Sequence, residues 1–306
     1  PQEFSASKVT RLYSDDYVEM VLIEVEHGLS RSVCTRAARM WKENRMIRPI
    51  LLFTDGKESF AIIIPGKGIG GEAKILSLSE RLYRTDIAVL ESMTFPGNAE
   101  TLVDAYDSTF FPYDKVRAEF FEGYRDLYHD LENAIRKELQ EKSTSFAQRF
   151  LGRLMFLYFL QRKGWLKGNK RFVDTVSDYR ELNTLFYESL NREGTPGIPY
   201  LNGSLFERED YLTQAMENRL FSKIDPVFKK ARAFLDQYNF TVDESSPMEV
   251  EVSVDPMLIG SVFENMLPEH ERGAKGTFYT PKNEISFICR RALVNYLRLN
   301  DDIKKS

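Results

Sequence analysis

One long apolar stripe constrains the fold of this chain more than any other feature. Its members recur at helical spacing over about five turns, with charged residues on the opposite side. They are Phe120, Phe121, Tyr124, Leu127, Tyr128, Leu131, Ile135 and Leu139. A second predicted helix, residues 146–165, is apolar nearly all round in its second half and must be covered by other helices. Residues 99–240 are therefore predicted to form a helical bundle domain with an aromatic core.

The first part of the chain, residues 1–98, is predicted to form a small α/β unit. Two short apolar runs, 49–54 and 59–65, flank an Asp-Gly-Lys-Glu turn, a pattern that predicts a β-hairpin. The other predicted elements are a helix over 30–44, a strand over 74–78, a helix over 81–91, and a segment over 17–25 that fits a strand or a helix.

Three residues of this unit have the spacing of an Asp…Glu-x-Lys nuclease site. Asp55, Glu72 and Lys74 would provide two carboxylates for Mg²⁺ and a lysine beside the attacking water. Against this, Asp55 lies in the hairpin turn and Glu72 follows loop glycines, whereas a working site needs both on neighbouring strands. The alternative is a turn aspartate with solvated loop charges. The unit can have a nuclease-like fold without a working site.

Composition excludes several classes of function. The net charge of −4 means that any DNA contact must come from local patches. Two cysteines, Cys34 and Cys289, and three histidines match no metal-ligand spacing, so no metal site is predicted from them. The longest apolar run, 154–160, is too short to cross a membrane, and no signal peptide is visible. A cytoplasmic protein without a membrane partner is expected.

One stretch concentrates positive charge. Residues 142–173 contain eight Lys or Arg and no Asp or Glu, with Trp165 and Phe172 among them. Such a stretch can grip DNA phosphates. The candidate DNA-binding residues are Arg162, Lys163, Lys167, Lys170 and Arg171. The alternative is a solvated helix end whose cations complement the helix dipole. A second, weaker basic stretch covers residues 31–48.

Residues 273–282 predict a turn that leads directly into a helix. Thr280 suits the N-cap and Pro281 the first helical position. The helix continues with apolar residues at three- and four-residue spacing, including Ile285, Ile288 and Leu293. A helix start beside a glycine-rich turn can bind an anion or a polar ligand, and the alternative is an ordinary helix cap.

Four stretches in this order resemble one enzyme family. They are the aromatic-rich helix 150–165 ending in Gln-Arg-Lys-Gly-Trp, the segments 198–207 and 254–265, and Gly-Thr-Phe-Tyr-Thr-Pro at 276–281. From about residue 84 to 297 the chain is similar to N6-adenine DNA methyltransferases. More narrowly, it resembles the fused restriction–modification enzymes called type IIG or Eco57I-like.

The resemblance implies a parent enzyme that methylates N6 of adenine in double-stranded DNA with S-adenosylmethionine. Phe278, Tyr279, Thr280 and Pro281 match the motif that walls the cofactor pocket in that family. The family's Gly-rich cofactor strand and its Asn-Pro-Pro-Tyr loop do not occur in these residues. The resemblance therefore implies an N-terminal portion that should not methylate DNA by itself and that contacts the rest of its own chain.

The expected fold class is α+β, mainly helical. It comprises the α/β unit, the bundle, and residues 241–306 as a linker and the start of a missing Rossmann-like methyltransferase domain. Two alternatives stay open for the function. One is an Mg²⁺-dependent nuclease in the N-terminal unit, and the other is a non-catalytic scaffold or DNA-binding subunit.

Overall fold

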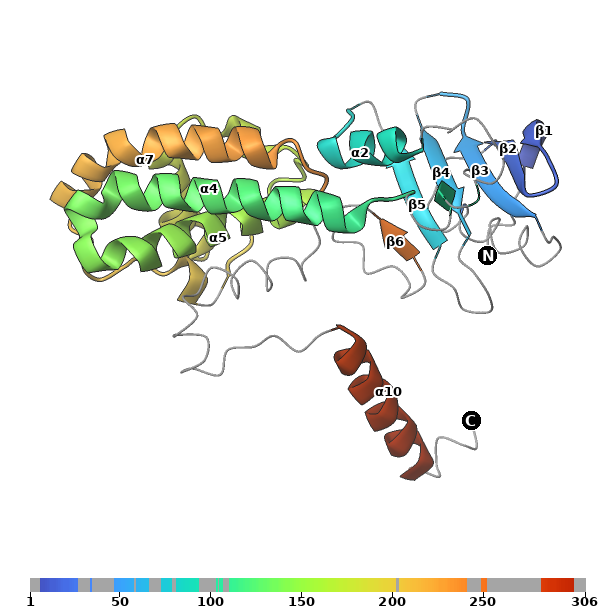
Figure 1. Cartoon of the computed structure of the whole chain (residues 1–306). Helices are drawn as coiled ribbons and strands as arrows, with labels where there is room; N and C mark the ends of the chain where they lie inside the picture. The colour runs from blue at the N-terminus through green and yellow to red at the C-terminus, as the bar shows by residue number, and fades with distance from the viewer. Residues whose placement is uncertain are drawn as a thin grey trace. The chain divides into compact units, whose positions relative to one another are not determined.

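The computed structural model of this chain divides into two compact units, Pro1–Asp255 and Pro256–Ser306, each described here by itself (Figure 1). The described residues are 6–26, 34, 47–57, 59–65, 73–78, 81–93, 103, 105–106, 110–201, 204–240, 249–251 and 282–299. The first unit contains both a β-sheet and a helical bundle, so the chain has a mixed α+β fold, as expected.

A six-stranded sheet forms one part of the first unit, with its strands in the order β1 to β6. The strands are β1 (Ala6–Ser14), β2 (Val18–Val25), β3 (Arg48–Thr54), β4 (Phe60–Ile64), β5 (Ala73–Leu78) and β6 (Glu249–Glu251). The pairs β2/β3 and β5/β6 are parallel, and the other neighbours are antiparallel. The sheet core includes Val21, Leu51, Phe53, Ile63 and Ile75.

The predicted hairpin is confirmed. In β3 and β4, Leu51 lies opposite Ile63 and Thr54 opposite Phe60. Asp55 stabilises the turn, because its Oδ1 accepts hydrogen bonds from the backbone N–H groups of Lys57 (3.0 Å) and Ser59 (3.2 Å). The ambiguous segment 17–25 is a strand. The predicted strand over 74–78 is confirmed as β5, and most of the predicted helix over 30–44 lies outside the described residues.

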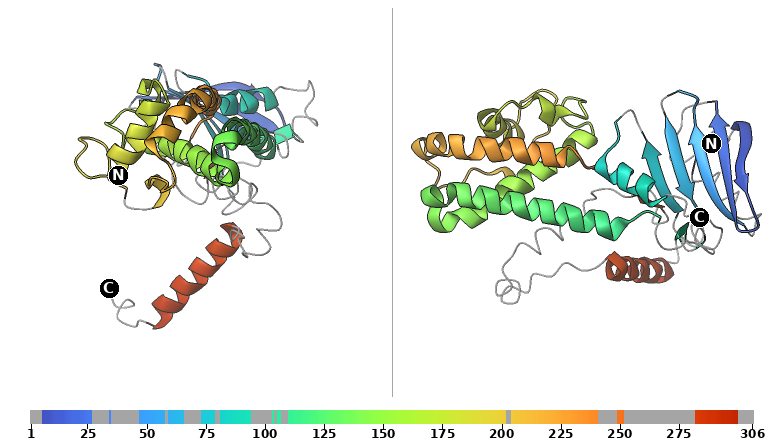
Figure 2. Two further views of the ribbon diagram at one scale, coloured as in Figure 1. Left: turned by 90° about the vertical axis from the view of Figure 1, so that its left-hand side faces the viewer. Right: turned by 45° about the horizontal axis from the view of Figure 1, so that its top comes forward.

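Helix α2 (Arg84–Ser92) confirms the helix predicted over 81–91, and it contacts β5. The helices of the bundle are α4 (Tyr113–Leu139), α5 (Ser143–Arg162), α6 (Tyr179–Thr184) and α7 (Gln214–Leu235). Shorter turns are the 3₁₀ segments η2 (Gln140–Lys142), η3 (Phe172–Thr175) and η5 (Ser204–Phe206), and the π-helical segment η4 (Leu185–Leu190). The helices α4, α5 and α7 pack along one another (Figures 1 and 2).

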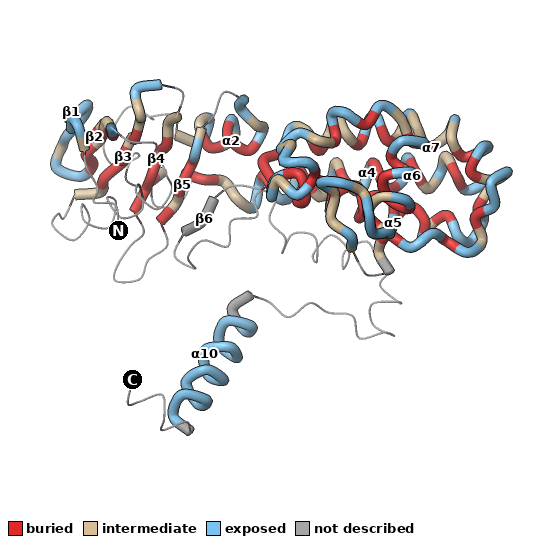
Figure 3. The backbone as a smooth tube through the Cα atoms, turned by 180° about the vertical axis from the view of Figure 1, so that it is seen from behind, coloured by how far each residue is buried: buried red, intermediate tan, exposed pale blue. Residues whose placement is uncertain are grey.

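The predicted apolar stripe is the buried face of α4. All of its members are buried except Phe121, which is intermediate, and Val116 extends the face toward the start of the helix. Figure 3 shows buried backbone on the facing sides of these helices and exposed backbone on their outer sides. In α5 buried residues occur on every side, as predicted from its composition, and they include a charged one, Arg153.

A glycine permits the close contact of α4 with α7. A Cβ atom added to Gly123 would lie 2.3 Å from Cε2 of Phe234, far inside van der Waals contact. Alanine in a helix normally gains about 0.5–1 kcal/mol over glycine. Here we expect the opposite sign, because the α7 ring must move to accommodate the methyl group.

The variant Gly123→Ala is therefore expected to lower the free energy of unfolding by about 1–3 kcal/mol, measured by urea denaturation. The double variant Gly123→Ala/Phe234→Leu should recover part of this loss, since the smaller side chain removes the clash. An increase in stability for Gly123→Ala alone would show that the two helices can separate without cost.

The second unit contains the helix α10 (Lys282–Leu299), which confirms the helix predicted after Pro281. Several of its large apolar side chains are exposed, among them Phe287, Ile288, Leu293 and Tyr296. Among the helices that the structure describes, none combines the length and apolar composition needed to cross a membrane.

Candidate nucleic-acid interface

The C-terminal end of α5 is closed by a Schellman motif, which sets the geometry of the basic residues that follow. Trp165 N–H donates to the carbonyl of Leu160 (3.0 Å) and Gly164 N–H to that of Gln161 (2.9 Å). Gly164 has a φ of +74°, the left-handed conformation that this motif requires and that glycine adopts without strain. The sequence Gln-Arg-Lys-Gly-Trp therefore encodes a sharp helix end.

Buried contacts hold the loop after α5 in place. Leu166 is fully buried, and the backbone N–H of Lys167 donates to the carbonyl of Gly197 (2.7 Å). The buried side chain of Gln161 accepts a hydrogen bond from the N–H of Val173 (2.9 Å). These contacts anchor the loop at both ends. The cations of the loop therefore extend from a backbone whose position is fixed.

All five candidate DNA-binding residues are exposed at this end of α5 and in the loop. We call Arg162, Lys163, Lys167, Lys170 and Arg171 the α5-end basic cluster. Arg171 pairs with Asp174 at 2.6 Å, whereas no described carboxylate pairs with the other four. Trp165, in the same segment, is 54% exposed. The structure therefore brings together four uncompensated positive charges and an exposed indole ring.

A small pocket of about 30 Å³ lies beside the cluster, and its lining includes Arg162, Lys170, Arg171, Arg81 and Asp236. Tyr158 donates a hydrogen bond to the Asp236 carboxylate (2.8 Å), and Arg81 donates to the backbone carbonyl of Asp236 (2.9 Å). Burial raises the pKa of Asp236, and the hydrogen bond from Tyr158 opposes that rise. The pocket has room for about one water molecule, so it is too small to hold a ligand. It only adds polar groups beside the cluster.

The remaining cations of the same sequence stretch have other partners. Lys142 lies over the ring of Tyr211 at 5.9 Å, and Arg149 pairs with Glu209 at 3.6 Å. Arg153 is only 1% exposed and donates to the carbonyls of Leu205 and Glu207. Arg153 is therefore structural, and Lys142 and Arg149 have partners within the bundle, although the charge pattern does not separate the three from the cluster.

A polar network lies beneath the segment 204–209, in which Phe206 is buried. Arg153 Nη1 lies 3.1 Å from Glu209 Oε1 and donates to the Tyr187 hydroxyl at 2.9 Å. Tyr187 in turn donates to Glu209 Oε2 at 2.9 Å. Sequence analysis missed this network; its only local signal is an arginine within the apolar half of a helix.

The structure does not bring together Asp55 and Lys74, the two described residues of the proposed nuclease site. Asp55 follows Thr54, which lies level with Phe60 and Leu78 across the sheet, whereas Lys74 lies level with Ile64. The two residues are therefore separated by about five residues along the strands, or roughly 16 Å. Lys74 Nζ instead donates to the carbonyl of Phe110 (3.0 Å), and Asp55 caps its own turn.

Glu72 lies outside the described residues. Among the residues that are described, no group of three or more His, Cys, Asp or Glu side chains could hold a metal ion. The described residues of the proposed site do not fit Mg²⁺, so the geometry supports the turn interpretation of Asp55.

Other predicted features lie outside the described part of the chain. These are the four cofactor-motif residues Phe278, Tyr279, Thr280 and Pro281, most of the second basic stretch, and the segment 254–265. Comparisons with protein-family models, with curated proteins and with solved structures found no match to this chain. The functional proposal therefore depends on the sequence motifs and on the α5-end basic cluster.

Proposed function

We propose that this chain is the N-terminal portion of a DNA adenine-N6 methyltransferase of a restriction–modification system. In this role it supports the catalytic domain and helps to hold double-stranded DNA. The parent enzyme would use S-adenosylmethionine and would extrude the target adenine from the duplex before methyl transfer. The ordered motifs described above support this assignment, and the DNA-holding role is supported separately by the α5-end basic cluster.

The observation that carries the DNA-holding role is the lack of counter-charge around four exposed cations. An exposed lysine that already pairs with a carboxylate gains little from a phosphate, because one weak ion pair replaces another. Arg162, Lys163, Lys167 and Lys170 have no such partner among the described residues. Each can neutralise a phosphate and release condensed counterions, and the exposed ring of Trp165 can contact a sugar or an unstacked base.

These contacts would position the DNA without reading its sequence. Lysine and arginine contacts to phosphates fix register and orientation, whereas base edges in the grooves carry the sequence information. The recognition sequence would therefore be read by another part of the parent enzyme. This division of roles predicts that the chain binds different duplexes with similar affinity.

The test is the salt dependence of binding to a short mixed-sequence duplex, measured by fluorescence anisotropy between about 50 and 200 mM salt. For the triple variant Arg162→Gln/Lys163→Gln/Lys167→Gln, the slope of log K against log salt is expected to become less steep by about three. Affinity should fall to a similar extent for duplexes of unrelated sequence.

A matched control removes the same number of each cation elsewhere. Lys57, Arg125 and Lys137 are exposed and lie on the hairpin turn and on α4. The variant Lys57→Gln/Arg125→Gln/Lys137→Gln changes the net charge equally and should leave the slope within about one unit of the unmodified chain. Equal slopes for the two triple variants would overturn the proposed interface. No salt-dependent binding by the intact chain would favour the non-catalytic scaffold.

A further inference from the structure

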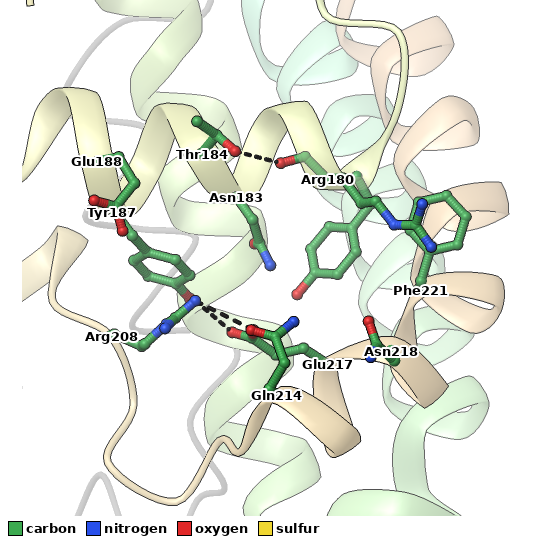
Figure 4. A pocket seen from close by; sticks show the side chains of 11 residues that line it. Arg180, Asn183, Thr184, Tyr187, Glu188, Arg208, Gln214, Glu217, Asn218 and Phe221 are labelled. Atoms are coloured by element: carbon green, nitrogen blue, oxygen red, sulfur yellow. Dashed lines mark hydrogen bonds and ion pairs between the residues drawn. The ribbon is translucent and has the colours of Figure 1, made fainter.

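A second pocket, away from the α5-end basic cluster, lies where α6 and the π-helical segment η4 meet the start of α7 (Figure 4). Its volume is about 260 Å³, slightly below the roughly 300 Å³ at which pockets for drug-sized ligands begin. A pocket of this size can enclose part of a small metabolite and leave the rest exposed to solvent. No motif identified in the sequence falls on it, and the proposed function does not use it.

The lining combines groups that recognise planar polar ligands. Three carboxamides contribute, from Asn183 on α6 and from Gln214 and Asn218 on α7, and Figure 4 shows Asn183 and Gln214 reaching toward each other across the pocket. A carboxamide presents one donor and one acceptor side by side, which matches the edge of a nucleobase. Asparagine and glutamine form such paired hydrogen bonds with adenine in particular.

The pocket also contains a flat cationic surface. The guanidinium of Arg180 lies over the ring of Phe221, 4.3 Å from its centroid, and no described carboxylate pairs with it. Arg208, in contrast, pairs with the buried Glu217 at 3.1 Å, so its charge is already balanced. Arg180 is therefore placed to attract an anionic group of a ligand.

The walls of this pocket are well supported. Tyr187 and Glu188 come from η4, and π-helical segments occur frequently at functional sites. The hydroxyl of Tyr187 accepts a hydrogen bond from Arg153 and donates one to Glu209. These two bonds fix the orientation of the Tyr187 ring, which lines the pocket. Thr213 caps α7 by accepting a hydrogen bond from Met216 N–H (3.3 Å), which sets the direction of the first turn that carries Gln214.

We propose that this pocket binds an adenine mononucleotide, independently of the DNA-binding role. The carboxamides of Asn183 and Gln214 hydrogen-bond the polar edge of the adenine, and Arg180, which lies over Phe221 about two turns farther along α7, binds the phosphate. The paired Arg208 and Glu217 close the side of the pocket and keep it polar without adding net charge.

Isothermal titration calorimetry of the full chain with AMP, adenosine, GMP and inorganic phosphate tests this assignment. AMP is expected to bind most tightly, adenosine more weakly, and inorganic phosphate not measurably. The variant Asn183→Ala/Gln214→Ala should weaken AMP binding at least tenfold. The variant Arg180→Gln should weaken AMP binding while leaving adenosine binding unchanged, which separates the phosphate contact from the base contacts.

A control pair removes exposed carboxamides that do not line the pocket. The variant Asn133→Ala/Gln237→Ala should bind AMP like the unmodified chain, since both side chains are exposed elsewhere. Circular dichroism spectra of all variants establish that the helices are retained. The proposal is overturned if AMP does not bind at millimolar concentration, if the control pair weakens AMP as much as the pocket pair, or if inorganic phosphate or GMP binds as tightly as AMP.

Discussion

Replacing Arg153 with methionine is expected to lower the free energy of unfolding by about 3–5 kcal/mol. The side chain is 1% exposed and donates to the carbonyls of Leu205 and Glu207 and to the Tyr187 hydroxyl. It also pairs with the buried carboxylate of Glu209 at 3.1 Å. Methionine can occupy much of the same volume, but it leaves two carbonyls without their donor and leaves the buried Glu209 carboxylate with only the more distant, exposed Arg149 as a cation. Such groups cost more than the original pair contributes.

Arg149 provides the matched control for this prediction. It approaches the same carboxylate oxygen at 3.6 Å, but its side chain is 43% exposed, so water can replace it. Arg149→Met is expected to cost less than about 1 kcal/mol in the same guanidinium chloride titration. The double variant Arg153→Met/Glu209→Gln should be more stable than Arg153→Met alone, because it removes a buried charge that has lost its nearest cation. Equal losses for Arg149→Met and Arg153→Met would contradict this account of the network.

The variant Phe120→Ala is expected to lose about 3–5 kcal/mol of stability, the range found when a buried phenyl ring is removed from a packed core. Phe120 is 1% exposed and contacts three aromatic rings of the α4–α7 interface. Its ring centroid lies 6.0 Å from that of Tyr124, 5.5 Å from that of Phe234 and 4.9 Å from that of Tyr238, the last in an edge-on arrangement. Truncation leaves a cavity that these rigid rings cannot fill.

The neighbouring residue gives a direct comparison. Phe121 has the same side chain and belongs to the same sequence stripe, but it is only partly buried. We expect Phe121→Ala to cost about half as much as Phe120→Ala or less, because less apolar surface leaves water when it folds. Thermal and urea unfolding of the two variants measure the difference. Equal costs would mean that Phe121 packs as tightly as Phe120 in solution.

The helices of the bundle could be predicted because their signal is local. Burial repeats with the helical period along α4, so the sequence indicates both the helix and its inward face. The error at Phe121 has a physical reason. Phe121 lies at the edge of the apolar stripe, and only the tertiary packing around α4 decides how wide the buried face is at that level.

The sheet could be predicted only in part. The hairpin of β3 and β4 is local, since a short turn joins two apolar runs. Strand β1 was missed because most of its residues are exposed, so it shows no apolar run. The parallel pairs β2/β3 and β5/β6 join segments distant in the chain, and no local pattern specifies such pairs.

The sequence by itself determined the period of the helices, the hairpin turn, and the concentration of cations near the end of α5. These features depend on residues within a few positions of one another. Only the tertiary structure decided which cations of the basic stretch are buried and hydrogen-bonded and which are exposed. Arg153 and Arg162 belong to the same basic stretch, yet one is buried among carbonyls from residues about fifty positions away and the other is exposed. The free energy of a charge depends on its solvent and its partners, and both are set by segments that meet only in the folded chain.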